Sequence, residues 1–392
     1  MRDLLALYEE VVRALDAREL TRAAARRVPP PAQGGRLVVF GLGKVAAEMV
    51  EAARGPADEA ILVVPQGAPA PPGTRVLRGS HPLPDASSLL AGEALLAAAA
   101  SLSEQDSVLL LISGGGSALA EAPHPDLSLD DVRAVNQALL HSGAPIEEMN
   151  CVRAHLSRLK GGGLARALYA RGVRRGRALV AVDVPLGGVR AVSSGPAIGD
   201  RTTCADALAL ARRYSLPEPA TRVRETLKPG DPADFIEHEA ICDLRSPAVE
   251  AARRSGARML DSPVRGTVEA FAERLARERG FVCASGELEV RVPPGAPHGG
   301  RDQHLALLMA RVLRGDPRAA FLAAGTDGRD GPTSSAGARV DGSTWEEAER
   351  RGLDPAKALA AFDAARVLHA LGLAIPERHT GAHAGDLFLL SR

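Results

Sequence analysis

The sequence has few aromatic residues, few lysines and few cysteines, and these shortages limit the kinds of ligand and site that the chain can have. Aromatic residues make up 3% of the 392 residues, so the flat rings on which nucleic-acid bases stack are poorly supplied. The four cysteines form no C-x-x-C pair and show no Cys/His spacing typical of zinc sites; they are Cys151, Cys204, Cys242 and Cys283. We therefore expect buried thiols in a reducing compartment, with no disulfide and no metal–thiolate site.

The chain also lacks an excess of charge and any long apolar run. It carries 48 basic and 48 acidic residues, so it offers no field that would attract nucleic acid or an anionic membrane, and we predict neither partner. No stretch approaches the roughly 18 uncharged apolar residues of a membrane span. Residues 3–16 have the spacing of an amphipathic helix rather than a signal peptide. We expect a cytoplasmic protein, and the sequence leaves open whether it is a homodimer.

The length and the order of apolar segments predict two domains. A chain of 392 residues exceeds what one core usually holds. Candidate buried strands lie at 37–40, 60–64, 74–77, 108–112 and 178–182, and helical stretches separate them. This alternation predicts a doubly wound, mostly parallel, Rossmann-like α/β domain over residues 1–230. Residues 225–239 are typical of a linker. A smaller mixed α/β domain is expected over residues 231–392, with strands that include 281–284, 288–292 and 319–323.

Glycine-rich loops are the strongest functional signal. The apolar segment 108–112 runs into Ser113-Gly114-Gly115-Gly116-Ser117. Glycine allows positive φ and close approach to a ligand, and the first N–H groups of a following helix point at an anion. Similar loops occur at 41–44, 161–163 and 325–332. Loops at the carboxyl ends of parallel strands meet in one crevice, so we predict phosphate or nucleotide binding there, although any one loop is equally consistent with a turn that binds nothing.

Two familiar nucleotide motifs do not account for these loops. Gly41 and Gly43 fit the G-x-G-x-x-A pattern of dinucleotide sites. The carboxylate that such a site needs about 20 positions later is missing, because the second strand candidate ends in Pro65-Gln66-Gly67. The P-loop pattern is matched nowhere. A nucleotide would therefore bind with another geometry.

Lysine placement supports an anion site. The four lysines are Lys44, Lys160, Lys228 and Lys357, and the first two adjoin glycine loops. Lysine brings a compact, mobile charge to a phosphate. The alternative is that these two lysines adjoin glycine loops by coincidence, because exposed turns often carry lysine. If residues 150–160 are helical, Arg153, Ser157 and Lys160 share one face and could clamp an anionic substrate. An ordinary solvated helix face is the alternative.

Carboxylates complete a set suited to phosphoryl transfer, which needs positive charge, Mg²⁺ ligands and a base. Asp327 and Asp330 could share Mg²⁺, although Asp-Gly turns often bind nothing. Asp183 follows the strand candidate 178–182, where active-site groups of a parallel sheet belong. The segment from His81 to Asp85 forms a proline-rich loop, and Arg301 stands at the start of a helix.

These segments, in this order, resemble the class II glycerate kinase family, whose C-terminal part is called the MOFRL domain. The resemblance implies ATP-dependent phosphorylation of D-glycerate to 2-phosphoglycerate, with Mg²⁺, in a cleft between two α/β domains. It implies that Lys44 and Arg301 lie at the catalytic centre. The segments that carry it are Gly41–Lys44, Ser80–Asp85, Ile112–Leu119, Val152–Gly162, Asp183-Val184-Pro185, Ser194-Gly195-Pro196, Gly299-Gly300-Arg301 and Ala324–Thr333. We therefore expect catalytic roles for Lys44, Arg301 and Asp183, and substrate contacts from His81, Asp85, Arg153, Ser157 and Lys160.

The chain departs from the family pattern at three places. Leu186-Gly187-Gly188 replaces G-D-D, Asp302-Gln303-His304 replaces N-Q-E, and Gly381-Ala382-His383-Ala384 replaces T-G-T-N. The first change removes two candidate metal or water ligands. Two alternatives therefore stay open: an NAD(P)H-dependent hydroxypyruvate reductase, and a catalytically weakened homologue that only binds ligands.

Overall fold

The structure is a computed structural model that describes residues 3–55, 57–184, 186–292, 295–296 and 299–392. The chain divides into two compact units, one of Ala17–Ile241 and one that combines Met1–Asp16 with Cys242–Arg392. The sequence-based boundary near residue 230 precedes this division, and the grouping of the first 16 residues with the C-terminal part is not visible in local sequence patterns.

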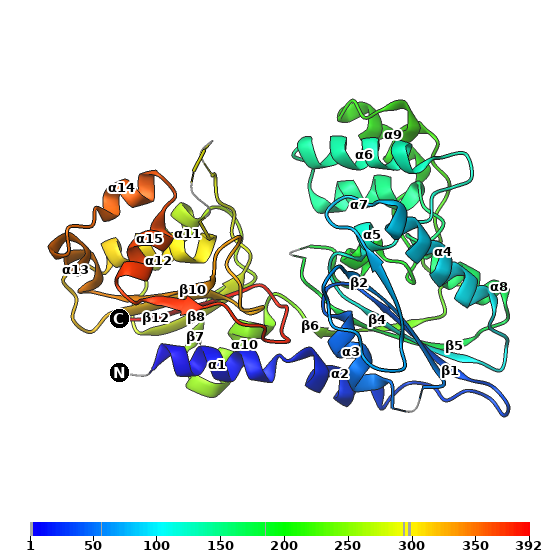
Figure 1. The fold of residues 1–392 in the computed structure, drawn as a ribbon, viewed down its shortest axis with the longest axis horizontal. Helices are drawn as coiled ribbons and strands as arrows, with labels where there is room; N and C mark the ends of the chain where they lie inside the picture. The colour runs from blue at the N-terminus through cyan, green and yellow to red at the C-terminus, as the bar shows by residue number, and fades with distance from the viewer. Residues whose placement is uncertain (1–2, 56, 185, 293–294, 297–298) are drawn as a thin grey trace. The chain divides into compact units, whose positions relative to one another are not determined.

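The first unit contains the predicted parallel sheet (Figure 1). Its order is β3-β2-β1-β4-β5-β6, the order of open sheets that reverse direction beside the first strand. The first five strands pair in parallel, and β1, β4 and most of β5 are buried along their length, as in sheets with helices on both faces. The strands are β1 (Leu37–Leu42), β2 (Glu59–Pro65), β3 (Arg75–Gly79), β4 (Ser107–Ile112), β5 (Arg175–Ala181) and β6 (Glu237–Cys242).

Helices cover both faces of this sheet, as a doubly wound fold requires (Figure 1). The helices α2 (Ala17–Ala25) and α3 (Ala46–Ala53) lie on one face, and α4 (Ala86–Ala100) and α8 (Gly163–Ala170) on the other. A separate helical layer of α6 (Leu129–His141), α7 (Ile146–His155) and α9 (Cys204–Arg213) has its own apolar cluster around Val135, Met149 and Val152. Short turns complete the unit: α5 (Gly116–Leu119), η1 (Gly188–Arg190), η2 (Val192–Ser194) and η3 (Glu218–Thr221).

The second unit is the expected mixed α/β domain, with sheet order β11-β10-β9-β12-β8-β7. The strand β9 pairs antiparallel with both of its neighbours. The strands are β7 (Arg258–Met259), β8 (Phe281–Gly286), β9 (Ala320–Gly325), β10 (Ser335–Asp341), β11 (Ala374–Pro376) and β12 (Asp386–Ser391). The strand expected at 288–292 is wrong: within it only Glu289 makes an isolated bridge, to Thr267.

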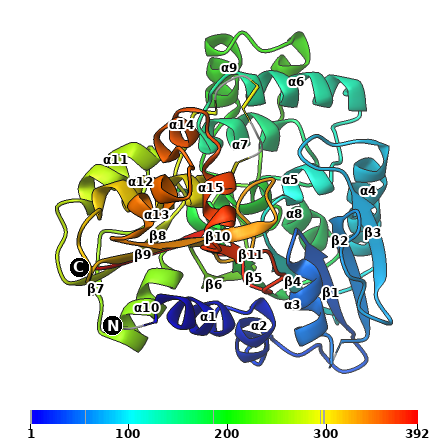
Figure 2. The same cartoon turned by 60° about the vertical axis from the view of Figure 1, so that its left-hand side comes forward.

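Helices also lie on both faces of the second sheet (Figure 2). On one face, α12 packs on β9 and β10 and is almost entirely buried. The opposite face is covered by α1 and α10. The helices are α1 (Leu4–Ala14), α10 (Ser246–Ser255), α11 (Val268–Leu275), α12 (Arg301–Val312), α13 (Thr344–Arg350), α14 (Pro355–Ala360) and α15 (Ala364–Ala370). Among the described residues, no helix has the length and apolar character needed to cross a membrane.

Candidate active site

A pocket of about 340 Å³ lies in the first unit, where several parallel strands end. Its walls include residues that follow four different strands: Lys44 after β1, His81 after β3, Gly114 and Gly115 after β4, and Asp183 after β5. Ligands of open α/β sheets bind at this edge, beside the point where the strand order reverses. This pocket brings together seven residues singled out in the sequence, which are Lys44, His81, Gly114, Gly115, Ser117, Arg153 and Asp183.

The loops after β1 and β4 are joined by hydrogen bonds that fix the position of Lys44. The backbone N–H of Lys44 donates to Gly114 O at 3.0 Å. The next N–H, of Val45, donates to the hydroxyl of Ser113 at 3.2 Å. The Lys44 side chain is exposed and makes no ion pair or side-chain hydrogen bond among the described residues. Its ammonium is therefore positioned at the pocket while its donors remain available to a ligand.

The glycines after β4 allow a close approach that other residues would block. A Cβ at Gly114 would collide with the Asp183 carboxylate, and Gly115 has φ of 86° and lies against the Lys44 side chain. Among the described residues, no acceptor is found for the N–H groups of Gly115 and Gly116. Such N–H groups can bind phosphate oxygens, so this part of the loop can hold an anion.

The electrostatics of the pocket favour a negatively charged ligand. Arg153 lines the pocket, and its Nε donates to Asn136 Oδ1 at 2.6 Å. Burial lowers the pKa of Arg153 to about 10, against the opposing charge of Glu121, so the guanidinium stays charged at neutral pH. Burial, together with Lys44 and Arg153, lowers the pKa of His81, an effect that Asp183 opposes. Two cations and a neutral imidazole thus face one carboxylate.

Sequence reasoning gave no role to several residues at this pocket. Ser193 lines it, and Ser193 and Ser194 have φ of 53° and 56°, a conformation that costs energy for residues other than glycine. The Ser193 hydroxyl donates to Ser113 O at 2.7 Å, which ties this turn to the loop after β4. The motif Ser194-Gly195-Pro196 was a signal for this turn. Asn136 and Asn150 line the pocket without any signal in the sequence.

The expected helix face of Arg153, Ser157 and Lys160 is wrong, because α7 ends at His155. Ser157 instead forms a bridge with Pro123. Lys160 is buried and pairs with the carboxylate of Glu121, and burial lowers its pKa. Ser157 and Lys160 line a different pocket, of about 380 Å³, that does not contain Arg153.

Other predicted residues have structural contacts in the described chain. Asp85 caps α4 by accepting the N–H of Ser87 at 2.8 Å and of Ser88 at 3.2 Å. Gly41 lies within β1, where a Cβ would collide with Val50 and Leu62, and Gly43 and Gly116 closely approach Ser113 and Ser193 respectively. Ser113 is fully buried. Ser117 lines the pocket, and its hydroxyl lies 2.7 Å from that of Ser194.

Arg301 lies in the second unit and is oriented by two carboxylates. Its Nε and Nη2 bond to Asp386 at 2.7 and 3.1 Å, and Nη1 donates to Glu287 at 2.8 Å. A guanidinium has five N–H groups, so two have no acceptor within the part of the chain that the structure describes. Although burial acts against its charge, Asp386 and Asp302 raise the pKa of Arg301. Burial raises the pKa of Asp386 to about 7, against the effect of Arg301.

The proposed metal residues Asp327 and Asp330 fit a shared Mg²⁺ poorly. Asp330 is buried and accepts the N–H of Asp302 at 3.0 Å, the N–H of Gln303 at 2.9 Å and the Gln303 amide at 3.2 Å. These bonds satisfy most of its lone pairs. Asp327 accepts the N–H of Arg329 at 3.0 Å. The geometry of this pair therefore does not favour a shared Mg²⁺ ion.

The departures from the family pattern occupy contrasting environments. Leu186 is exposed, Gly187 precedes η1, and Pro185 lies outside the described residues. Asp302 is fully buried and its Oδ2 has no hydrogen-bond partner among the described residues. His304 is buried and stacks on Phe362, with ring centroids 4.8 Å apart. Ala382 and Ala384 are buried.

Comparison with known proteins agrees with this description. The family model described as "Domain of unknown function (DUF4147)" matches residues 3–228, and that of the "MOFRL family" matches residues 280–386. A "Putative hydroxypyruvate reductase" from Agrobacterium vitis is 38% identical over 91% of this chain and 87% of that protein. A "Glycerate 2-kinase" from Pyrococcus horikoshii is 31% identical over the same shares, 91% and 87%.

A solved structure gives the same result. The crystal structure of glycerate kinase from Thermotoga maritima superposes with a TM-score of 0.89 at 29% identity, over 98% of this chain and 97% of that one. The resemblance to glycerate kinases is therefore confirmed at the level of sequence and of fold. The chain belongs to the glycerate kinase family in which a DUF4147 region is followed by a MOFRL region.

Proposed function

We propose that this protein transfers the γ-phosphoryl group of ATP to the C2 hydroxyl of D-glycerate, giving 2-phosphoglycerate and ADP. The observation that carries the proposal is the pocket at the ends of β1, β3, β4 and β5, where Lys44, Arg153, Asp183 and the glycine loop meet. Kinases act mainly by positioning their substrates and by stabilising charge on the transferring group, and these residues supply both.

Each residue has a distinct role in the proposed reaction. The guanidinium of Arg153 binds the carboxylate of D-glycerate, since its planar fork matches a carboxylate. The N–H groups of Gly115 and Gly116 bind phosphate oxygens. Asp183 accepts the proton of the C2 hydroxyl while the oxygen of that hydroxyl forms a bond to the γ-phosphorus. The bond from that phosphorus to the bridging oxygen of ADP breaks in the same step, and Lys44 stabilises the charge on the oxygens of the transferring group.

Arg301 is part of the proposal through the family resemblance, with its two remaining N–H groups directed at a phosphoryl oxygen. Lys44 and Arg301 belong to different units, and the family resemblance is the ground for proposing that both act in this reaction. Mg²⁺ would neutralise charge on the phosphates of ATP, and we assign no residue as its ligand.

A coupled assay tests the proposed function. ADP release should require ATP, Mg²⁺ and D-glycerate, and omission of any one should reduce the rate to background. The alternative, a reductase, is suggested by the name of the Agrobacterium vitis relative. This chain does not have the carboxylate that binds the ribose of NAD(P)H in dinucleotide sites, because β2 ends at Pro65 and is followed by Gln66. Oxidation of NADH with hydroxypyruvate, without ATP, would replace the kinase by the reductase.

A further inference from the structure

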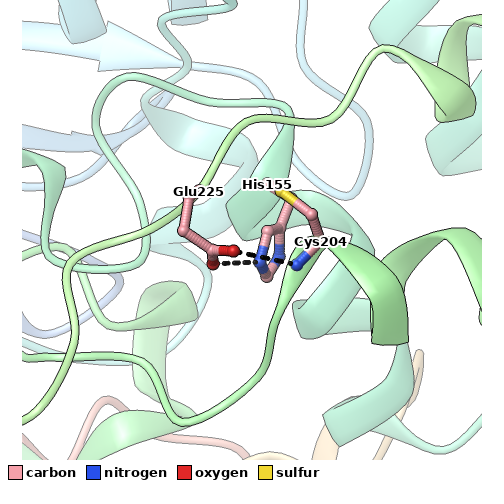
Figure 3. Close-up of side chains that lie close together, drawn as sticks. All are labelled: His155, Cys204 and Glu225. Carbon is pink, nitrogen blue, oxygen red and sulfur yellow. Dashed lines mark hydrogen bonds and ion pairs between the residues drawn. The ribbon is translucent and has the colours of Figure 1, made fainter.

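Three potential metal ligands from separate elements meet outside the active-site pocket (Figure 3). His155 is the last residue of α7, Cys204 is the first residue of α9, and Glu225 lies in the segment after η3. One ligand atom from each lies within 4.8 Å of the other two. His155 and Glu225 are 70 residues apart in the chain, which explains why no zinc-type spacing is visible in the sequence.

The hydrogen bonds of His155 leave one ring nitrogen for a ligand. The side chain is fully buried, and its Nδ1 lies 2.8 Å from the carbonyl oxygen of Cys151. A carbonyl only accepts, so Nδ1 carries the proton and donates it. Nε2 then presents its lone pair toward Glu225 Oε1, 3.4 Å away. Metal-binding histidines typically donate their other N–H to a carbonyl or carboxylate in this way.

Nε2 of His155 is buried and faces Glu225, whose side chain is 50% exposed, and a cation or a proton between two such acceptors would satisfy both. The Glu225 carboxylate accepts the N–H of Cys204 at 3.3 Å through Oε2 and pairs with Lys228 Nζ at 2.5 Å through Oε1. Nε2 of a neutral His155 and this carboxylate both present lone pairs. A second proton on His155 would satisfy them, and so would a metal ion.

We propose that His155 Nε2, Cys204 Sγ and the Glu225 carboxylate bind a Zn²⁺ ion, with a fourth position open to water. A nitrogen, a thiolate and a carboxylate are typical ligands of zinc rather than of Mg²⁺. Ligands of a tetrahedral zinc lie roughly 3.5 Å apart, so the existing separations require only small movements of two partly exposed side chains. Burial and Glu225 raise the pKa of the Cys204 thiol, and zinc binding releases that proton to solvent.

Lys228 is the cation that competes with the metal. Its Nζ lies 2.5 Å from Glu225 Oε1 and also donates to Thr226 Oγ1 at 2.7 Å and to the carbonyl of Thr202. With zinc bound, Lys228 keeps the Thr202 and Thr226 contacts while Glu225 directs an oxygen to the metal. Asp200 also faces the ring, with Oδ2 4.0 Å from Nδ1. A bound zinc ion would link α9 and the segment after η3 to the C-terminal end of α7, and α7 also carries Arg153.

The test measures zinc binding directly, with full-length protein freed of metal by a chelator and dialysis. Zn²⁺ is titrated in competition with a chromogenic chelator, and Co²⁺ is added separately as a spectroscopic probe. The parent should bind one Zn²⁺ per chain, and bound Co²⁺ should show a thiolate-to-metal charge-transfer band in the near ultraviolet. Zn²⁺ should also raise the melting temperature, because a ligand of the native state stabilises it.

Two variants separate this site from adventitious binding. Cys204→Ser removes the thiolate at a partly exposed position and should abolish the charge-transfer band. It should also weaken zinc binding by more than the roughly 10–100-fold loss typical of changes to outer partners. Cys283→Ala removes a buried thiol in the other unit and should leave both readouts unchanged. Absence of zinc binding by the parent, or equal binding by Cys204→Ser, would overturn the proposal.

Discussion

At the scale of single residues, the backbone of Lys44 is held by a hydrogen bond, while its side-chain ammonium is available to a ligand. Its N–H is bonded to Gly114 O at 3.0 Å. Its side chain passes the loop after β4, where a Cβ at Gly115 would lie 3.2 Å from both Cγ and Cε of the lysine. The glycine at position 115 therefore leaves room for the lysine chain beside the proposed phosphate site.

We predict that Lys44→Met lowers kcat by about 10²–10³-fold, the usual loss when one preorganised contact to the transition state is removed. Methionine keeps an apolar stem and removes the charge, so stability should change by less than about 0.5 kcal/mol. Steady-state kinetics and thermal melting measure the two effects. Lys357→Met, at an exposed lysine of α14, is the matched control and should retain the parent kcat. A Lys44→Met enzyme with more than half the parent kcat would contradict the role proposed for this lysine.

Asp302 predicts a second effect, on stability rather than rate. Burial, with Asp386 and Asp330 nearby, holds the pKa of Asp302 well above its usual range. The folded state therefore keeps a proton that the unfolded state loses as the pH rises above about 4. Stability contributed by this group is highest at low pH and declines as the pH rises toward the folded pKa.

Asp302→Asn should remove that decline, because an amide of the same shape does not ionise. Urea denaturation of parent and variant at a series of pH values measures it. We expect the variant to gain stability relative to the parent as the pH rises from about 4 to 7. A constant difference between the two proteins across this range would mean that Asp302 ionises normally in the fold.

At the scale of elements, the ends of strands were predictable and the end of α7 was not. The expected strand 108–112 ends where β4 ends, the expected 178–182 ends one residue after β5, and β1 runs two residues past the expected 37–40, with Gly41 inside it. The loops after these strands carry Lys44, the glycine loop and Asp183. Helical spacing continued past His155 in the sequence. In the structure the chain leaves the helix because His124 N–H bonds to Leu156 O at 3.2 Å and Arg158 N–H bonds to Ala122 O at 2.7 Å. Such long-range partners have no local signal.

The same segment carries a prediction about Lys160. Its ammonium and the Glu121 carboxylate are both almost completely buried. Removal of one partner of a buried ion pair leaves an unpaired charge, so Lys160→Met should lower the free energy of unfolding by about 3–5 kcal/mol. The double variant Lys160→Met/Glu121→Leu should recover part of that loss. Chemical denaturation measures both variants. A single variant as stable as the parent but with a raised KM for D-glycerate would instead assign Lys160 to substrate binding.

At the scale of the whole molecule, composition and strand–helix alternation were sufficient for two α/β domains but not for the membership of α1. This helix packs in the C-terminal unit, where the Tyr8 hydroxyl donates to Gly325 O at 2.7 Å across 317 residues of sequence. Arg378 also pairs with Glu9 at 3.2 Å. The amphipathic pattern of residues 3–16 predicts a helix with one buried face. The surface that covers this face belongs to the C-terminal unit, which is distant in the sequence, so local patterns do not identify it.

The central claim concerns the product, and phosphorus NMR tests it most directly. The protein is incubated with ATP, Mg²⁺ and D-glycerate, and the phosphorus spectrum of the new monoester is recorded without proton decoupling. Phosphate on C2 couples to the single proton of that carbon and gives a doublet, which is the result we predict. A triplet, from the two protons of C3, would show phosphorylation at the other hydroxyl. The absence of any new phosphorus signal would contradict the assignment of kinase activity to this chain.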